Sequence, residues 1–133
     1  MRPEKHLEAF EERKETIFKW AIEVRGLENS QRIIGDNASK GIVELLSACL
    51  HKEKKIEEGF QINHTWFKSE KVFGRLPEFR NRAAIINKML ELEKICEKLS
   101  YGAPKQAEMA RKAVEIFQGL ERIIKEVMYG GEK

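Results

Sequence analysis

Polar and aromatic side chains suited to contact with phosphate gather in one stretch of the chain, between residues 60 and 82. They are Asn63, His64, Trp66, Lys68, Arg75, Arg80, Asn81 and Arg82. Guanidinium forks match phosphate oxygens, and a tryptophan ring offers a stacking face for a base. The candidate residues for contact with a ligand or RNA are therefore His64, Trp66, Arg75, Arg80, Asn81 and Arg82.

The same residue types also have a structural explanation. Trp66 would then belong to the core, and arginines at the start of a helix would be solvated or would cover apolar surface with their stems. His51 lies near the end of the second predicted helix, among lysines. We therefore expect it on the surface, near the negative end of the helix dipole.

Several other chemistries lack the residues that they need. The sequence has no GxGxxG, GxxxxGK or HExxH motif, and no histidine has a glutamate three residues before it, as a di-iron bundle requires. The only aspartate is Asp36, which we expect at the opposite end of the fold from His64, so a Ser-His-Asp arrangement is not indicated. We therefore expect no catalytic set, no cofactor and no metal.

Composition indicates an all-α fold. The 22 acidic residues comprise 21 glutamates and one aspartate, and glutamate is much the better helix former. Two threonines and five valines leave little material for strands. The 25 basic residues give a net charge of only +3, so binding driven mainly by release of counterions from nucleic acid is not indicated, although RNA is permitted. The excess of lysine and glutamate is typical of proteins from thermophiles.

Apolar periodicity predicts helices over about 4–34, 37–58, 77–99 and 104–128. Pro3 opens the first helix, Gly26 would bend it, and Gly35 to Asn37 supply a stop and an N-cap for the second. The linker 60–76 is too apolar to float in solvent, so we expect a short helix from about Thr65 to Val72 to pack on the bundle. Short turns elsewhere favour antiparallel neighbours. The prediction is one domain, 1–133, folded as an antiparallel up-down four-helix bundle with this extra helix between helices two and three.

Two quantities indicate a homodimer. A first helix of 31 residues would be about 46 Å long against about 33 Å for the second, so about two turns would overhang unless the first helix breaks. The apolar positions of the fourth helix span about 200°, wider than the roughly 100° that a surface helix needs. The alternative is that neighbouring helices and the linker bury this whole arc.

We expect a cytoplasmic protein without a membrane anchor. Residues 1–13 carry alternating charges without an apolar signal region, and no apolar run of about 18 residues occurs. Cys49 and Cys96 each lie on an apolar helix face, so we expect two buried thiols rather than a disulfide or a zinc site.

The stretch NASKGIVELL over residues 37–46 lies on the predicted second helix. With this stretch, the helix pattern over about residues 15–128 resembles the HEPN superfamily of prokaryotes, which includes the substrate-binding subunits of nucleotidyltransferases. The resemblance implies a dimer and a small nucleotidyltransferase as a partner. Some members are ribonucleases that use an arginine followed, after four to six residues, by a histidine.

That ribonuclease motif is missing from this chain. The positions after Arg80 hold Ile85, Ile86 and Asn87, and those after Arg82 hold Asn87, Lys88 and Met89. Without its general base, cleavage of RNA by that route is in doubt.

The function that we predict is therefore a non-catalytic, HEPN-like, dimeric binding or partner subunit. The alternative is an RNA-binding protein or ribonuclease that uses His64, Arg75, Arg80 and Arg82. A small-molecule pocket inside the bundle is a third hypothesis, supported only by the general habit of helical bundles.

Overall fold

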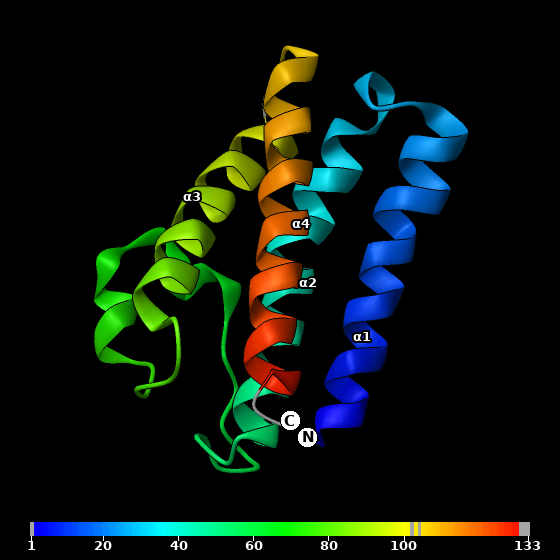
Figure 1. Cartoon of the computed structure of the whole chain (residues 1–133). Helices are drawn as coiled ribbons and strands as arrows, with labels where there is room; N and C mark the ends of the chain where they lie inside the picture. The colour runs from blue at the N-terminus through cyan, green and yellow to red at the C-terminus, as the bar shows by residue number, and fades with distance from the viewer. Residues whose placement is uncertain (1, 102, 104, 131–133) are drawn as a thin grey trace.

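Figure 1 shows the computed structural model of the chain, which describes residues 2–101, 103 and 105–130. Four α-helices carry the fold, and they are α1 (Pro3–Glu15), α2 (Gln31–Lys52), α3 (Arg82–Ser100) and α4 (Ala107–Tyr129). The shorter helical segments are η1 (Thr16–Glu23), η2 (Glu28–Ser30), η3 (His64–Lys68) and η4 (Glu70–Gly74). No strand occurs in these described ranges. The prediction of an all-helical chain with four main helices is confirmed.

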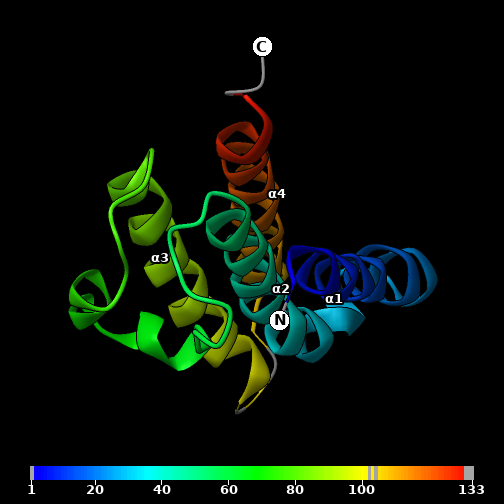
Figure 2. The ribbon, with the colours of Figure 1, turned by 90° about the horizontal axis from the view of Figure 1, so that it is seen from below.

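The α2 helix occupies the centre of the fold. Figures 1 and 2 show it between α1 on one side and the α3 and α4 helices on the other, and α2 contacts all three. Side chains also join α1 to α4: the ring of Phe10 stacks on that of Phe117 at 5.7 Å, and Lys14 Nζ lies 2.7 Å from Glu121 Oε2. The η3 segment covers the outer side of α3 (Figure 2), so the linker packs against the helices, as its apolar residues require.

The first predicted helix is wrong in length because the backbone breaks at Gly26. The α1 helix continues into η1, whose wider π-helical turns end at Glu23. Gly26 then adopts φ +84°, a left-handed conformation that favours glycine, and the chain turns back through η2 into α2. A rod from residue 4 to residue 34 does not form, so the overhang that favoured a homodimer does not exist.

Gly35 does not end a helix, contrary to the prediction; it lies inside α2, where that helix meets α3. A Cβ atom at Gly35 would lie 2.6 Å from Ser100 Oγ and 2.8 Å from the carbonyl oxygen of Cys96. Asp36, predicted as part of a turn and cap, instead accepts a hydrogen bond of 2.7 Å from Ser100 Oγ. The Gly-Asp-Asn sequence therefore serves a close contact between helices.

The remaining boundaries shift by several residues. The α2 helix ends at Lys52 rather than at residue 58, and Lys54 just beyond it has a left-handed φ of 57°. The α3 helix begins at Arg82, well after Pro77, and α4 begins at Ala107. The predicted opening at Pro104 lies outside the described residues. In the linker, two 3-10 segments replace the single helix expected over 65–72, because Ser69 between them is extended.

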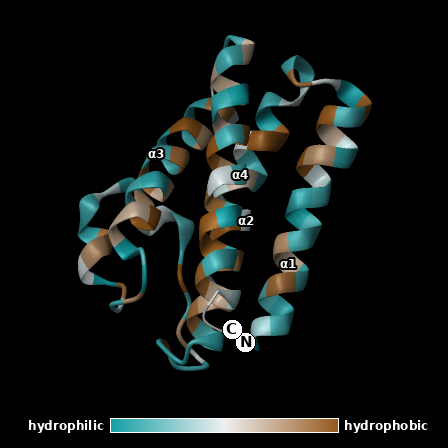
Figure 3. Ribbon diagram, viewed as in Figure 1, coloured by the Kyte–Doolittle hydropathy of each residue, from teal (hydrophilic) through white to brown (hydrophobic). Residues whose placement is uncertain are grey.

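The apolar arc of α4 is mostly buried inside this one chain. Its buried members are Ala110, Ala113, Ile116, Phe117, Leu120, Ile124, Val127 and Met128. Figure 3, coloured by hydropathy, shows apolar and polar residues alternating along α4 and the other helices. Neighbouring helices therefore cover most of the arc, and its width gives no argument for a dimer.

Both cysteines are free and buried, as the sequence predicts. Burial raises the pKa of the Cys49 thiol to about 12 and that of the Cys96 thiol to about 12, because the low-dielectric interior disfavours a thiolate.

Candidate functional site

His64 is held at the start of η3 by contacts on both sides of it. The side-chain oxygen of Asn63 caps the segment and accepts hydrogen bonds from the backbone nitrogen and the hydroxyl of Thr65, each 2.8 Å long. Phe67, three residues after His64, is fully buried and anchors η3 in the core. The local sequence therefore fixes the backbone from which the His64 side chain projects.

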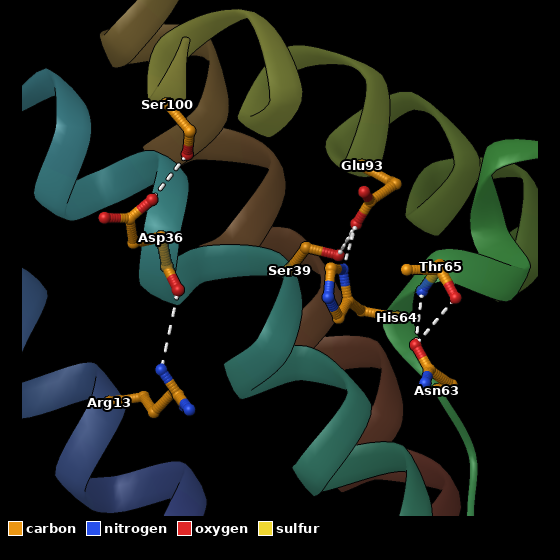
Figure 4. Close-up of polar contacts among 8 residues, drawn as sticks. All are labelled: Arg13, Asp36, Ser39, Asn63, His64, Thr65, Glu93 and Ser100. Atoms are coloured by element: carbon orange, nitrogen blue, oxygen red, sulfur yellow. Dashed lines mark hydrogen bonds and ion pairs between the residues drawn. The ribbon is translucent and has the colours of Figure 1, made fainter.

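The imidazole of His64 meets a buried carboxylate on α3. His64 Nδ1 lies 3.1 Å from Glu93 Oε1, and Ser39 Oγ on α2 donates a 2.7 Å hydrogen bond to the same oxygen (Figure 4). Glu93 is only 3% exposed, and a carboxylate in such a place needs donors to offset its lost hydration. We call Ser39, His64 and Glu93 the Glu93 cluster.

The geometry of this cluster fixes which histidine nitrogen faces a ligand. A proton on Nδ1 lets His64 donate to Glu93, which leaves Nε2 to accept from a ligand when the ring is neutral and to donate when it is charged. The His64 side chain remains 31% exposed, so it is open to solvent. Ser39 donates to the carboxylate and not to the imidazole, so the cluster lacks the order of hydrogen bonds that activates a serine nucleophile.

The Glu93 cluster borders a run of three adjoining clefts. A cleft of about 400 Å³ between α3 and the linker shares Lys68, Glu93 and Glu97 with a small one of about 60 Å³. That small cleft shares Lys40 and His64 with a third, of about 300 Å³, which extends towards α1. We call this run the His64 groove.

Two lysines on the wall of the His64 groove have no ion-pair partner among the described residues. Within the part of the chain that the structure describes, neither Lys40 nor Lys68 has a carboxylate oxygen within 4.0 Å of its ammonium group. Arg13, at the α1 end, is occupied, because its Nη1 donates to Asn37 Oδ1 at 2.9 Å and lies 3.5 Å from the Asp36 carbonyl (Figure 4). The carboxylates that line the three clefts are Asp36, Glu44, Glu70, Glu91, Glu93 and Glu97, and the basic groups are Arg13, Lys40, Lys68 and Lys94.

Arg82, a predicted contact residue, is engaged inside the chain. Its Nε donates to the carbonyl of Pro77 at 2.9 Å, and its Nη2 donates to the carbonyls of Leu76, at 3.1 Å, and Phe73. Its guanidinium also lies 5.3 Å from the centre of the Phe73 ring. Arg82 therefore fastens the end of the linker to the start of α3.

Arg75 and Trp66 do come together, as a cation and an aromatic ring. The Arg75 guanidinium lies 4.8 Å from the centre of the Trp66 ring, and Phe60 meets that ring edge-on at 5.9 Å. Trp66 is half-buried against the core. Arg75 covers a face of the ring, so a base would stack there only after displacing it.

Arg80 and Asn81 serve the junction before α3. Arg80 is exposed, and its Nη2 would lie 3.4 Å from a Cβ atom at Gly130, so it sits at the end of α4. Asn81 has a left-handed φ of 61°, a conformation that asparagine tolerates better than most residues. The six predicted residues thus make their contacts in different places, and His64 alone among them belongs to the Glu93 cluster.

The sequence analysis missed Ser39 and Glu93, which position His64. The signal was present: Glu93 stands four residues after Met89 and three before Cys96, on the buried face of α3. A charged residue at a core position of an amphipathic helix requires a buried partner. Ser39 likewise lies between the buried Ala38 and Ile42 on α2.

Among the described residues, no three histidine, cysteine, aspartate or glutamate side chains are placed to hold a metal ion. The same residues include no helix with the length and apolar character needed to cross a bilayer. Comparison of the chain with models of protein families, with curated proteins and with solved structures finds no match.

Proposed function

We propose that this chain is a non-catalytic, HEPN-like binding subunit, folded as an antiparallel up-down four-helix bundle, whose ligand site is the His64 groove. The observation that carries the proposal is the Glu93 carboxylate, buried and shared by Ser39 and His64. Burying a charge costs free energy, and here the buried carboxylate fixes a partly exposed imidazole at the junction of two clefts.

The ligand class follows from the groups that face the groove. Lys40 and Lys68 line the small cleft beside His64, and the acidic groups there are Asp36, Glu93 and Glu97. Asp36 and Glu93 each accept a hydrogen bond from a serine, so the two lysines without a carboxylate partner, together with His64, suit a phosphate oxygen of a nucleotide or of RNA. Binding is favoured over cleavage because Arg82, one of the arginines that the sequence grouped with His64, donates its hydrogen bonds to linker carbonyls instead.

The test is titration of the 15N-labelled full chain with adenosine monophosphate and with a short RNA, at low and moderate salt. We expect saturable shifts at His64, Ser39 and Glu93 that weaken as salt rises. The double variant Lys40→Gln/Lys68→Gln should bind at least about tenfold more weakly. A matched control is Lys55→Gln/Lys71→Gln, which removes the same charge from exposed positions outside the groove. Equal binding by both double variants would contradict the proposal.

A homodimer stays in the proposal for a new reason, a pair of exposed apolar side chains on η1 and directly after it. Trp20 is 56% exposed and Val24, four residues later, is 69% exposed, so both lie on one side of the helix. The indole nitrogen of Trp20 donates to Glu15 Oε1 at 3.2 Å, and Lys19 Nζ lies 5.2 Å from the centre of the ring, so an apolar partner would meet the ring beside this lysine. Light scattering after size exclusion should show a dimer that Trp20→Glu converts to a monomer. A monomeric parent chain would remove the dimer and leave the ligand site standing.

A nucleotidyltransferase is the protein partner that the proposal names, on the resemblance alone. The test is co-expression with a small nucleotidyltransferase encoded beside this chain, followed by affinity purification of the pair. Failure to co-purify would remove this partner.

The second candidate is an RNA-binding protein or ribonuclease. The contact of Arg75 with Trp66 favours it, because a base that displaced the guanidinium from the indole would find a stacking face and a cation side by side. The test is cleavage of a labelled RNA by the parent chain and by His64→Gln, with RNA binding of Arg75→Ala and Arg80→Ala measured in parallel. Cleavage that His64→Gln abolishes would establish the second candidate and overturn the non-catalytic assignment.

A further inference from the structure

A separate cleft lies between α3 and α4, where the C-terminal half of α3 approaches the N-terminal half of α4 (Figure 1). Its volume is about 570 Å³. Small-ligand sites span roughly 300–1,000 Å³, so the space suits a small molecule. One face of each helix lines it, with lysines on the walls and Ile95 and Met109 as the apolar residues. We call this cleft the lysine groove, after Lys94, Lys98, Lys105 and Lys112.

The two carboxylates of the lysine groove already have cationic partners. Glu91 lies 3.7 Å from Lys112 Nζ and 3.9 Å from Lys88 Nζ. Glu108 receives a 2.6 Å hydrogen bond from Arg111. The acidic groups are therefore largely neutralised, and the charge that remains in the groove is positive.

That positive charge sits on Lys94 and Lys98, one helical turn apart on α3. Within residues 2–101, 103 and 105–130, neither ammonium group has a carboxylate oxygen within 4.0 Å. Like charges four residues apart on a helix repel each other. Lys105 Nζ donates to the carbonyl of Ala103 at 2.6 Å, so this third ammonium group is already engaged. An anion between Lys94 and Lys98 would replace the repulsion with two attractive contacts.

The apolar part of the groove adjoins this charge. Ile95 directly follows Lys94 and is 9% exposed, and Met109 faces it from α4 as a half-buried side chain. Methionine adapts its shape to what lies against it, since its chain is unbranched and flexible. A ligand that satisfied the whole groove would carry a negative head and an apolar body.

We propose that the lysine groove binds a small anionic amphiphile, a carboxylate or phosphate head on a short apolar chain. The head lies between Lys94 and Lys98, and the chain lies on Ile95 and Met109. This site is distinct from the phosphate site proposed at His64, since its apolar residues lie between α3 and α4 and not beneath the linker. Glu91 and Lys94 line both this groove and the cleft between α3 and the linker, so the residues that separate the two proposals are Lys98 and Met109.

The experiment is titration of the 15N-labelled full chain with octanoate and octyl phosphate, with acetate and octylamine as probes that lack the chain or the negative charge. We expect saturable binding of octanoate and octyl phosphate, with shifts at Ile95 and Met109, and no saturation with acetate or octylamine. The relative affinities of the two anions show whether the head is a carboxylate or a phosphate. Octanoate binding no better than acetate, or shifts confined to the His64 groove, would overturn the proposal.

Variants separate this site from its neighbour. Lys94 also borders the His64 groove, so Lys98→Glu is the informative charge change. It should weaken octanoate at least about tenfold, while Lys71→Glu, an equal charge change on η4, should leave it unaltered. Met109→Gln should weaken octanoate and leave the Lys40 and Lys68 site intact. An acidic amphipathic peptide that binds in place of octanoate, or variants that all bind alike, would count against the small-molecule assignment.

Discussion

The ring of His51 stacks on the ring of His6, with centroids 5.3 Å apart and an angle of 14° between the planes. His6 is buried, and its Nδ1 lies 3.0 Å from Glu44 Oε2 on α2, so the first turn of α1 is tied to the central helix. His51 Nε2 is buried and has no hydrogen-bond partner. His51 is therefore partly exposed in the last turn of α2, near the expected place, but its ring takes part in the contact between α2 and α1.

This contact predicts a loss of stability in mild acid. Loss of hydration in the helix contact, and then repulsion from His6, lower the pKa of His51 from its usual 6.5, with Glu58 acting in the opposite direction. A base whose folded pKa is lowered binds fewer protons in the native state than in the unfolded state. Its contribution is complete above the unfolded pKa and declines as the pH falls from there towards the folded pKa.

The measurement is urea unfolding of the parent chain and of His51→Gln between about pH 7.5 and pH 5. The parent should lose more unfolding free energy across this range than the variant, since glutamine does not titrate. An identical pH profile for the two proteins would show that His51 does not contribute.

The fit of Gly35 against α3 predicts opposite effects of alanine at two glycines. Gly35→Ala places a methyl group 2.8 Å from the Cys96 carbonyl oxygen, and should cost about 1–3 kcal/mol of unfolding free energy. Gly119, inside α4, has nothing within 4 Å of its added Cβ, so Gly119→Ala should stabilise the chain by about 0.5–1 kcal/mol through helix propensity. Denaturant titration of both variants measures the difference, and equal signs would contradict the close approach of α2 and α3.

These glycines also show what periodicity could and could not predict about the fold. The sequence predicted the helical class and the approximate position of each helix, because apolar spacing is a property of each segment alone. It placed the turn between the first two helices at Gly35 to Asn37, although the turn is at Gly26. Glycine favours both a left-handed turn and close helix contact, and only the partner helix distinguishes these uses.

The site was predicted in part for a similar reason. His64 was singled out by its residue type, yet the two residues that hold it come from α2 and α3, distant in sequence. The arginines were grouped with His64 because they are near it along the chain. Arg82 instead turns towards carbonyls of the linker, a preference that depends on how the linker ends.

Arg82 should be a stability residue rather than a ligand contact. Arg82→Met removes the donors to the carbonyls of Leu76 and Pro77 and should cost about 1–3 kcal/mol of unfolding free energy. Arg80→Met, at the exposed neighbour, should change it by less than about 0.5 kcal/mol. Thermal unfolding checks both, and equal effects would contradict the role assigned to Arg82.

The two thiols should be inert in the folded chain. Cys49 and Cys96 are buried with pKa values raised to about 12, so neither presents a thiolate near neutral pH. A colorimetric disulfide reagent should label neither cysteine in buffer and both in denaturant. Rapid labelling without denaturant would show that the contact between α2 and α3 opens readily.

Because the other helices surround α2, its positions should tolerate few substitutions. Most of its 22 residues are buried, and Gly35 and Gly41 allow no added side chain without displacing neighbours on α3, α1 or α4. In a saturation mutagenesis library selected for folded protein, tolerated changes should be few from Ile34 to Leu50 and frequent on the outward faces of α1 and α4. The central helix would thus be the slowest part of the chain to diverge, and the best segment with which to detect distant relatives.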